Sequence, residues 1–254
     1  MSTVGEPRTV LAIGAHPGNI ELLCAGALAL LKQQGWRIVM ATLTPGKSAE
    51  SAALSEDGAR SHVEQATRSA AVLDAEYRCL ESADFTIFFS DAPCRHVTGL
   101  IRAARPELVL THSSLDHVAD HSETSRIVRQ ACVSAPVRDY LVKDVAGGEK
   151  PTGSVPHLYY VDPPDGKDFL GRQVTPSLIV DVSSVIETKE QMLALYTSQR
   201  DRDEHLEKMR KWSRQRGQQA GCTFGEGFRQ HLGDSYPSDD LLKTALRSLT
   251  HATP

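Results

Sequence analysis

A short apolar segment that runs into a polar turn and then a helix constrains the fold more than any other feature. Residues 9–15 are almost entirely apolar, as in a strand buried on both faces of a parallel sheet. After the polar turn 16–21, apolar residues recur at helical spacing over 22–34, and Gly35 follows as a helix C-cap would. Residues 37–43 have the composition of a second buried strand. This order predicts two parallel strands joined by a right-handed crossover.

The same alternation continues along the chain. It predicts helices over 55–73, 95–104 and 124–131, and strands over 76–80 and 108–111. Further strands are expected at 157–161 and 178–182, with one or two helices over 185–219. Alternating strands and helices are typical of a doubly wound α/β sheet. We therefore expect one α/β domain over residues 1–254, with the Gly- and Lys-rich loop 142–154 on its surface.

Composition and charge exclude several classes of protein. The 28 Lys and Arg residues are scattered and slightly outnumbered by 32 Asp and Glu, which argues against a nucleic-acid-binding surface. No apolar run approaches the roughly 18–20 residues that span a bilayer. Residues 1–9 have no apolar signal core, so a cytoplasmic protein without a membrane partner is expected. The five cysteines are odd in number and widely separated, which indicates neither a disulfide framework nor a C-x-x-C metal site.

Two polar clusters follow the first and fourth predicted strands, at 16–21 and 112–121. They contain four of the ten histidines, namely His16, His112, His117 and His121. In open α/β sheets ligands bind beyond the carboxyl ends of the strands. If these strands are neighbours, both clusters face one crevice, which would be the functional site. The alternative is that polar loops simply contain polar residues.

The segment His16-Pro17-Gly18-Asn19-x-Glu21 resembles the A-H-P-D-D loop of the PIG-L/LmbE superfamily of metal-dependent de-N-acetylases, which is often followed by x-E. Residues 116–121, Asp-His-Val-Ala-Asp-His, resemble the D-x-H-P-D-H segment of that family, and 196–199 its H-x-S-Q. The resemblance covers almost the whole chain, because it extends to residues 25–28, 43–46, 105–113, 156–163 and 226–233.

This resemblance implies a Rossmann-like three-layer α/β/α fold with a mostly parallel sheet. It also implies a zinc site whose ligands correspond to His16, Asn19 and His121. Three protein ligands and a water are the usual catalytic zinc arrangement, and zinc lowers the pKa of that water to about 7. The family reaction would then be hydrolysis of an amide in a small polar molecule, such as an N-acyl amino sugar or a biosynthetic intermediate.

The sequence departs from the family pattern at its decisive positions. Gly18 replaces the general-base Asp, and Asn19 replaces the Asp ligand. Val118 stands where many relatives have a His that stabilises the transition state. Loss of a base typically lowers a rate 10²–10⁴-fold. We therefore expect weak zinc binding and slow or no hydrolysis of simple N-acetylglucosamine compounds.

Other residues could substitute. Candidate catalytic groups are His117, Asp116 and Asp120, and the residues expected to line the substrate are Gly18, His112, Val118 and Gln199. Glu21 is expected to be structural. Three functions remain open: an amide hydrolase, a degenerate member that binds a small molecule or a partner protein, and a tailoring enzyme with changed chemistry. A small-molecule substrate is expected, and a homo-oligomer is possible.

Overall fold

A single mixed sheet runs through the computed structural model, which describes residues 7–46, 56–80, 82, 84–142, 150–197 and 202–252. Its strand order is β3-β2-β1-β4-β5-β7-β6-β8. The first five of these strands are parallel: β1 Thr9–Gly14, β2 Arg37–Thr42, β3 Glu76–Cys79, β4 Leu108–Thr111 and β5 His157–Val161. The predicted α/β class and the parallel N-terminal half are thereby confirmed.

The C-terminal strands extend the sheet in antiparallel fashion. Strand β7 (Gly225–Gln230) pairs antiparallel with β5 and with β6 (Leu178–Asp181), and β8 (Thr250–Ala252) pairs antiparallel with β6. Neither β7 nor β8 is among the strands predicted from the sequence.

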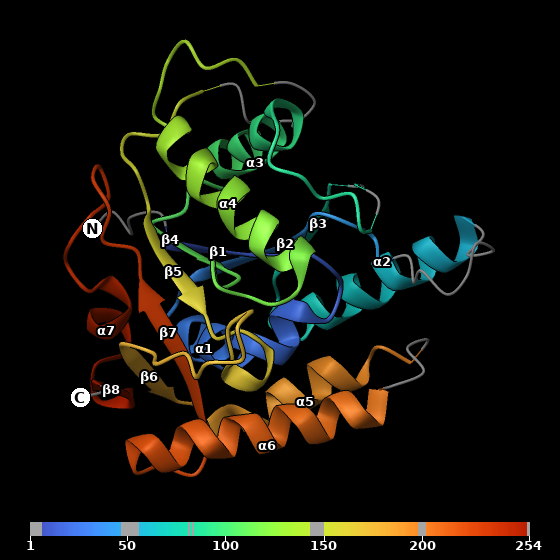
Figure 1. The fold of residues 1–254 in the computed structure, drawn as a ribbon, viewed down its shortest axis with the longest axis vertical. Helices are drawn as coiled ribbons and strands as arrows, with labels where there is room; N and C mark the ends of the chain where they lie inside the picture. Colours follow the sequence, from blue (N-terminus) through green and yellow to red (C-terminus); the bar gives the residue numbers. More distant parts are fainter. Residues whose placement is uncertain are drawn as a thin grey trace, which may run out of the picture.

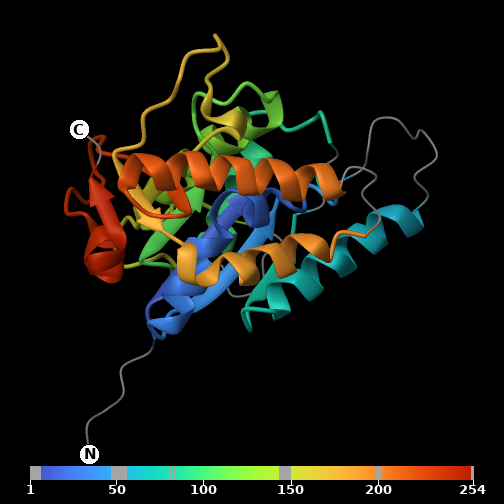
Figure 2. The same cartoon turned by 90° about the horizontal axis from the view of Figure 1, so that it is seen from below.

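Helices cover both faces of the sheet, as Figures 1 and 2 show. On one face lie α1 (Asn19–Gln33), α2 (Glu56–Ala71), α5 (Ile186–Ala194) and α6 (Arg202–Ala220), and on the other α3 (Asp91–Ala104) and α4 (Ala119–Ser134). Helix α7 (Leu241–Leu246) packs near the antiparallel edge, and short 3₁₀ turns span Pro164–Gly166, Ser183–Val185 and Arg247–Leu249.

The alternation of side chains along strand β1 explains why helices pack on both faces of the sheet. Val10 and Ala12 belong to the core that packs against α1, whereas Leu11 and Ile13 belong to the core formed with α3 and α4. Side chains alternate between the faces of a strand, so an all-apolar strand can bury both faces.

Several predicted boundaries shift. Helix α4 is longer than the predicted 124–131, α1 begins at Asn19, and the stretch 185–219 forms two helices. Of the predicted surface loop, residues 143–149 lie outside the described residues, and the others are exposed or half-buried. Within the described ranges, no helix combines the length and the apolar character needed to cross a membrane.

Candidate functional site

The loop after β1 holds the first site residues in a tight turn. Gly18 caps α1 with φ 93°, a left-handed conformation that glycine adopts without steric penalty. The backbone N–H of His16 donates to Asn19 Oδ1 at 2.8 Å, and Asn19 N–H donates back to the His16 carbonyl at 3.2 Å. Asn19 therefore closes the turn that presents His16.

His16 is paired with a carboxylate of helix α4. Its Nε2 donates to Asp120 Oδ2 at 2.9 Å, and the same oxygen accepts from Phe85 N–H at 2.9 Å. Burial alone would raise the pKa of Asp120, but these hydrogen bonds outweigh it and hold that pKa below its usual value. Asp120 also lies in the first turn of α4, where the helix dipole favours a negative charge.

His121 forms a second histidine–carboxylate pair. Its Nδ1 lies 3.0 Å from Asp116 Oδ2, and Asp116 Oδ1 accepts from Val118 N–H at 2.9 Å. Asp116 and His121 are both buried. Pairing through Nδ1 leaves His121 Nε2 available to a ligand, which is the arrangement found for metal-bound histidines.

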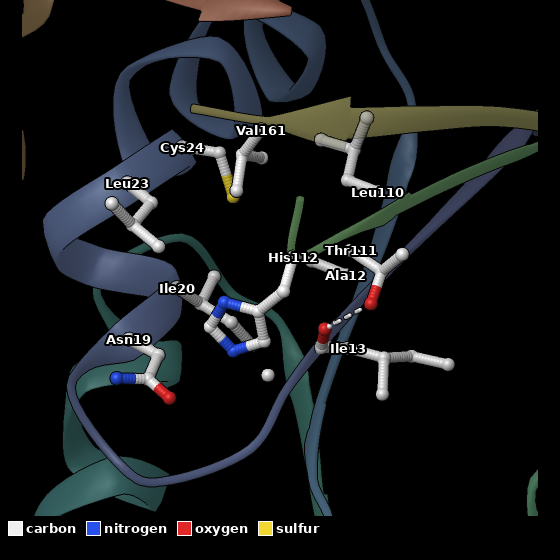
Figure 3. Close-up of a pocket in the computed structure, with 11 residues that line it drawn as sticks. Ala12, Ile13, Asn19, Ile20, Leu23, Cys24, Leu110, Thr111, His112 and Val161 are labelled. Atoms are coloured by element: carbon white, nitrogen blue, oxygen red, sulfur yellow. Dashed lines mark hydrogen bonds between the residues drawn. The ribbon is translucent and has the colours of Figure 1, made fainter. Parts of the chain in front are cut away.

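His112 lies behind this pair and is held in its neutral form. Its Nε2 accepts from Ala15 N–H at 2.9 Å, and its ring stacks on that of His121 with centroids 3.9 Å apart. Burial, reinforced by His121 and His16, lowers the pKa of His112 well below its ordinary value. Its Nδ1 is buried and has no hydrogen-bond partner among the described residues. Figure 3 shows the ring beside Asn19 and Ile20 at a small, mostly apolar cavity.

The two polar clusters therefore meet at the carboxyl ends of β1 and β4, which are neighbours in the sheet. The rings of His16 and His121 lie 5.6 Å apart. His117 is exposed. Because α4 begins only at Ala119, His117 and His121 do not share a helical face. The Nδ1 of His117 lies 3.9 Å from Asp116 Oδ1. Val118 is half-buried before α4.

Three further expectations can be placed. Gly18 is buried in the turn, beside Asn19. Gln199 lies outside the described residues. Glu21 is buried, and it accepts hydrogen bonds from Ser69 Oγ at 2.7 Å and from the Tyr196 hydroxyl at 2.8 Å. It therefore links α1 to α2 and to the segment after α5, as expected of a structural residue.

Two residues that contact the site or the loops around it were not predicted from the sequence. Asp84 follows β3 and interacts with His16, Asp120 and Thr44, and burial raises its pKa. Arg229 of β7 is half-buried, and its Nη2 donates to Ser113 Oγ at 2.6 Å, next to His112 in the chain. The only signal for Asp84 was its place after a third parallel strand, whereas Arg229 belongs to a strand that the sequence pattern did not reveal.

The donor set can be tested against a zinc-type ion. His16 and His121 each offer a second ring nitrogen, and Asn19 offers a neutral amide oxygen that already accepts one hydrogen bond. These donors fit zinc, although none of the three carries a negative charge. The ligand atoms of His112, Asp116 and His121 also lie within 4.8 Å of one another. That set is the poorer one, because both carboxylate oxygens of Asp116 already accept hydrogen bonds, from Val118 N–H and from His121.

Comparisons with known proteins agree with this architecture. The PIG-L family, described as GlcNAc-PI de-N-acetylase, matches residues 11–132. The 4-oxalmesaconate hydratase of Pseudomonas putida KT2440 is 26% identical over 227 residues, which are 86% of this chain and 83% of that protein. Residues 11–132 are thus similar to the PIG-L family, as the motifs of the chain indicated.

Two solved structures show the same fold. The structure of 4-carboxy-2-hydroxymuconate hydratase from P. putida KT2440 has a TM-score of 0.75 at 22% identity, covering 92% of this chain and 99% of that one. The structure of N,N'-diacetylchitobiose deacetylase from Pyrococcus horikoshii also has a TM-score of 0.75, at 21% identity, covering 93% and 89%. The fold is therefore shared by enzymes named for hydration and for deacetylation.

Proposed function

We propose that this protein is an enzyme that adds water across a carbon–carbon double bond of a small carboxylate-bearing molecule. The observation that carries the proposal is the convergence of two histidine–carboxylate pairs, His16–Asp120 and His121–Asp116, beside a turn in which Gly18 supplies no base. The similarity to a hydratase over most of the chain supports water addition.

The paired residues can move a proton at defined atoms. Asp120 holds His16 through Nε2 and stabilises the charged imidazolium, so that His16 can accept a proton from water and return it to substrate. In hydration, the oxygen of water bonds to one carbon of the double bond, and a proton adds to the other. His112 stays neutral behind His121 and fixes that ring by stacking.

A bound metal ion would take over the activation of water from His16, because the ring nitrogen of His16 that would ligate the ion is the one that otherwise accepts the proton. His16, His121 and the amide oxygen of Asn19 are the residues that would hold it, with Asp116 and Asp120 supplying negative charge from behind. When bound, zinc lowers the pKa of its water to about 7. Replacing a carboxylate ligand by a neutral amide leaves more of the ion's charge uncompensated, so we expect weaker binding than in relatives with Asp at the position of Asn19.

Arg229 supports the choice of an anionic substrate. Its guanidinium is half-buried, and its Nε is buried without a hydrogen-bond partner among the described residues. A planar guanidinium with a spare donor is suited to a carboxylate. Its bond to Ser113 ties it to the loop after β4, which also carries His112.

The test is an assay of hydration on a panel of unsaturated dicarboxylates, in which the reaction is monitored by the loss of their ultraviolet absorbance. Asp120→Asn should lower kcat about 10²–10⁴-fold. Glu123→Gln on the same helix, which removes a carboxylate bonded to Phe89 and Arg126, is the matched control and should leave kcat unchanged. Arg229→Gln should raise KM about 10–100-fold, the equivalent of a lost charged hydrogen bond.

Amide hydrolysis is the second candidate, favoured by the family match over residues 11–132. It is measured in parallel as acetate release from N-acetyl sugars, which we expect to be slow or absent. Gly18→Asp with Asn19→Asp should raise zinc content, although the first substitution places a side chain on a backbone with φ 93°, at a cost of roughly 1–2 kcal/mol. Acetate release by the native protein without any hydration would overturn the hydratase proposal, and binding without turnover would favour a degenerate member.

A further inference from the structure

A second cluster of metal-ligating side chains lies at the antiparallel end of the sheet. Asp181 ends β6, Cys222 lies in the turn between α6 and β7, and His251 lies in β8. One carboxylate oxygen, the Cys222 sulfur and one ring nitrogen of His251 all lie within 4.8 Å of one another. This cluster shares no residue with the crevice, and three strands separate β6 from β1 in the sheet.

The register of the sheet is what brings these residues together. Strand β8 pairs Ile179 with His251, and β7 pairs Asp181 with Gly225, three residues after Cys222. Side chains two apart on a strand share a face, so Asp181 lies on the face of Ile179 next to His251. All three residues of the cluster are half-buried, which leaves the group open to solvent on one side.

The carboxylate and the thiol are held by further contacts. Asp181 Oδ1 accepts from Ser183 N–H at 2.9 Å and from Ser183 Oγ at 2.6 Å. The thiol lies 3.4 Å from the Phe224 carbonyl, and Cys222 N–H donates to the Gly217 carbonyl at 2.9 Å. The cluster thus combines an oriented carboxylate and a fixed thiol with the imidazole of His251.

We propose that Asp181, Cys222 and His251 bind a divalent cation of the zinc class. Sulfur, nitrogen and oxygen donors together suit Zn²⁺ and its soft analogue Cd²⁺, whereas Mg²⁺ and Ca²⁺ prefer all-oxygen sites. Three protein ligands leave one tetrahedral position, which water fills from the open side. On binding, the S–H bond of Cys222 breaks, the metal–sulfur bond forms, and the proton passes to solvent.

The bound ion would stabilise the attachment of strand β8 to the sheet. Among the described residues β8 pairs only with β6, over three residues. A metal that joins β8 to Asp181 and to the α6–β7 turn stabilises the folded protein by mass action, because the unfolded chain lacks the assembled site. The site is therefore structural in role, and it is independent of the function proposed above.

The experiment is a titration of the full chain with Cd²⁺, followed by the ultraviolet charge-transfer band of a cadmium–thiolate bond. We expect one equivalent to bind with this band. Cys222→Ser should abolish the band, while Cys79→Ser, which removes the other half-buried thiol, should preserve it. The double variant His16→Ala with His121→Ala should also preserve it, which separates this site from the crevice.

Two further measurements keep the result interpretable. Ser183→Ala removes a contact behind the ligand and should weaken binding about 10–100-fold. Zn²⁺ should raise the melting temperature of the variant His16→Ala with His121→Ala, but not after Cys222→Ser is added to it, and the metal-free fold of each variant is checked by circular dichroism. Absence of a thiolate band in the native chain, or its persistence in Cys222→Ser, would overturn the proposal.

Discussion

Replacing Lys189 by methionine tests how the helix layer is attached to the sheet. Lys189 of α5 donates from Nζ to Glu226 Oε1 of β7 at 2.7 Å, and each side chain is 1% exposed. Glu226 also accepts from the backbone N–H groups of Gly26 and Ala27 at 2.9 and 2.8 Å. The carboxylate thus connects three elements and is shielded from solvent.

The expected loss follows from this geometry. Lys189→Met keeps most of the side-chain volume but leaves a buried carboxylate without its cation, and such a change typically costs about 3–5 kcal/mol of unfolding free energy. In a protein of this size that corresponds to a fall in melting temperature of roughly 2–4 °C per kcal/mol. The double variant Lys189→Met with Glu226→Gln should recover part of the loss, because the uncompensated charge is then removed.

The assay is equilibrium unfolding in urea, with the midpoint compared at constant slope. Arg210→Met is the matched control, since Arg210 of α6 pairs with Glu190, the next residue on α5, at a solvent-exposed position. Surface pairs contribute about 0–1 kcal/mol. If Lys189→Met costs no more than Arg210→Met, the reasoning from burial is wrong.

Two other changes have defined outcomes. Because burial lowers the pKa of His112 below its ordinary value of 6.5, the unfolded chain takes up a proton as the pH falls below 6.5 while the folded chain does not. Unfolding free energy should therefore drop by up to about 1.4 kcal/mol per pH unit below that point, and His112→Gln should flatten the dependence measured by urea midpoints. Gly26→Ala places a methyl 2.7 Å from Val182 and 2.8 Å from Glu226, which should cost about 1–3 kcal/mol in the same assay. Gly153→Ala has open space around it, and a loss there equal to that of Gly26→Ala would contradict the steric argument.

The elements that could be predicted from the sequence are those whose own residues carry a clear hydrophobic pattern. Strand β1 is a continuous apolar run, and the helix after it has regular apolar spacing, so neither depends on distant residues. Strand β7 begins Gly-Glu-Gly, and its buried Glu226 is paired with Lys189 of helix α5 and with backbone N–H groups of helix α1. A pairing of that kind leaves no trace in hydrophobic periodicity.

In the candidate site, too, some residues could be predicted from the local sequence and others could not. His16 and His121 were predicted to converge because each follows a strand of the parallel half, and the carboxyl ends of such strands share an edge. The first turn of α4 was missed because it carries the buried polar residues Asp120 and His121 in place of apolar ones. Arg229 could not be predicted, since its position depends on the antiparallel pairing of β7 with β5.

The contact between Glu226 and helix α1 has a consequence for the order of folding. Glu226 and Gly26 are 200 residues apart in the chain. During synthesis, β1, α1 and β2 emerge long before β7. One apolar side of α1 therefore stays exposed until the last part of the chain has left the ribosome. Closing so long a loop is slow, and exposed apolar surface favours aggregation in the meantime. Yield in the cell should therefore depend on how rapidly the C-terminal half is completed, and chains that stop before β7 are expected to be captured by chaperones.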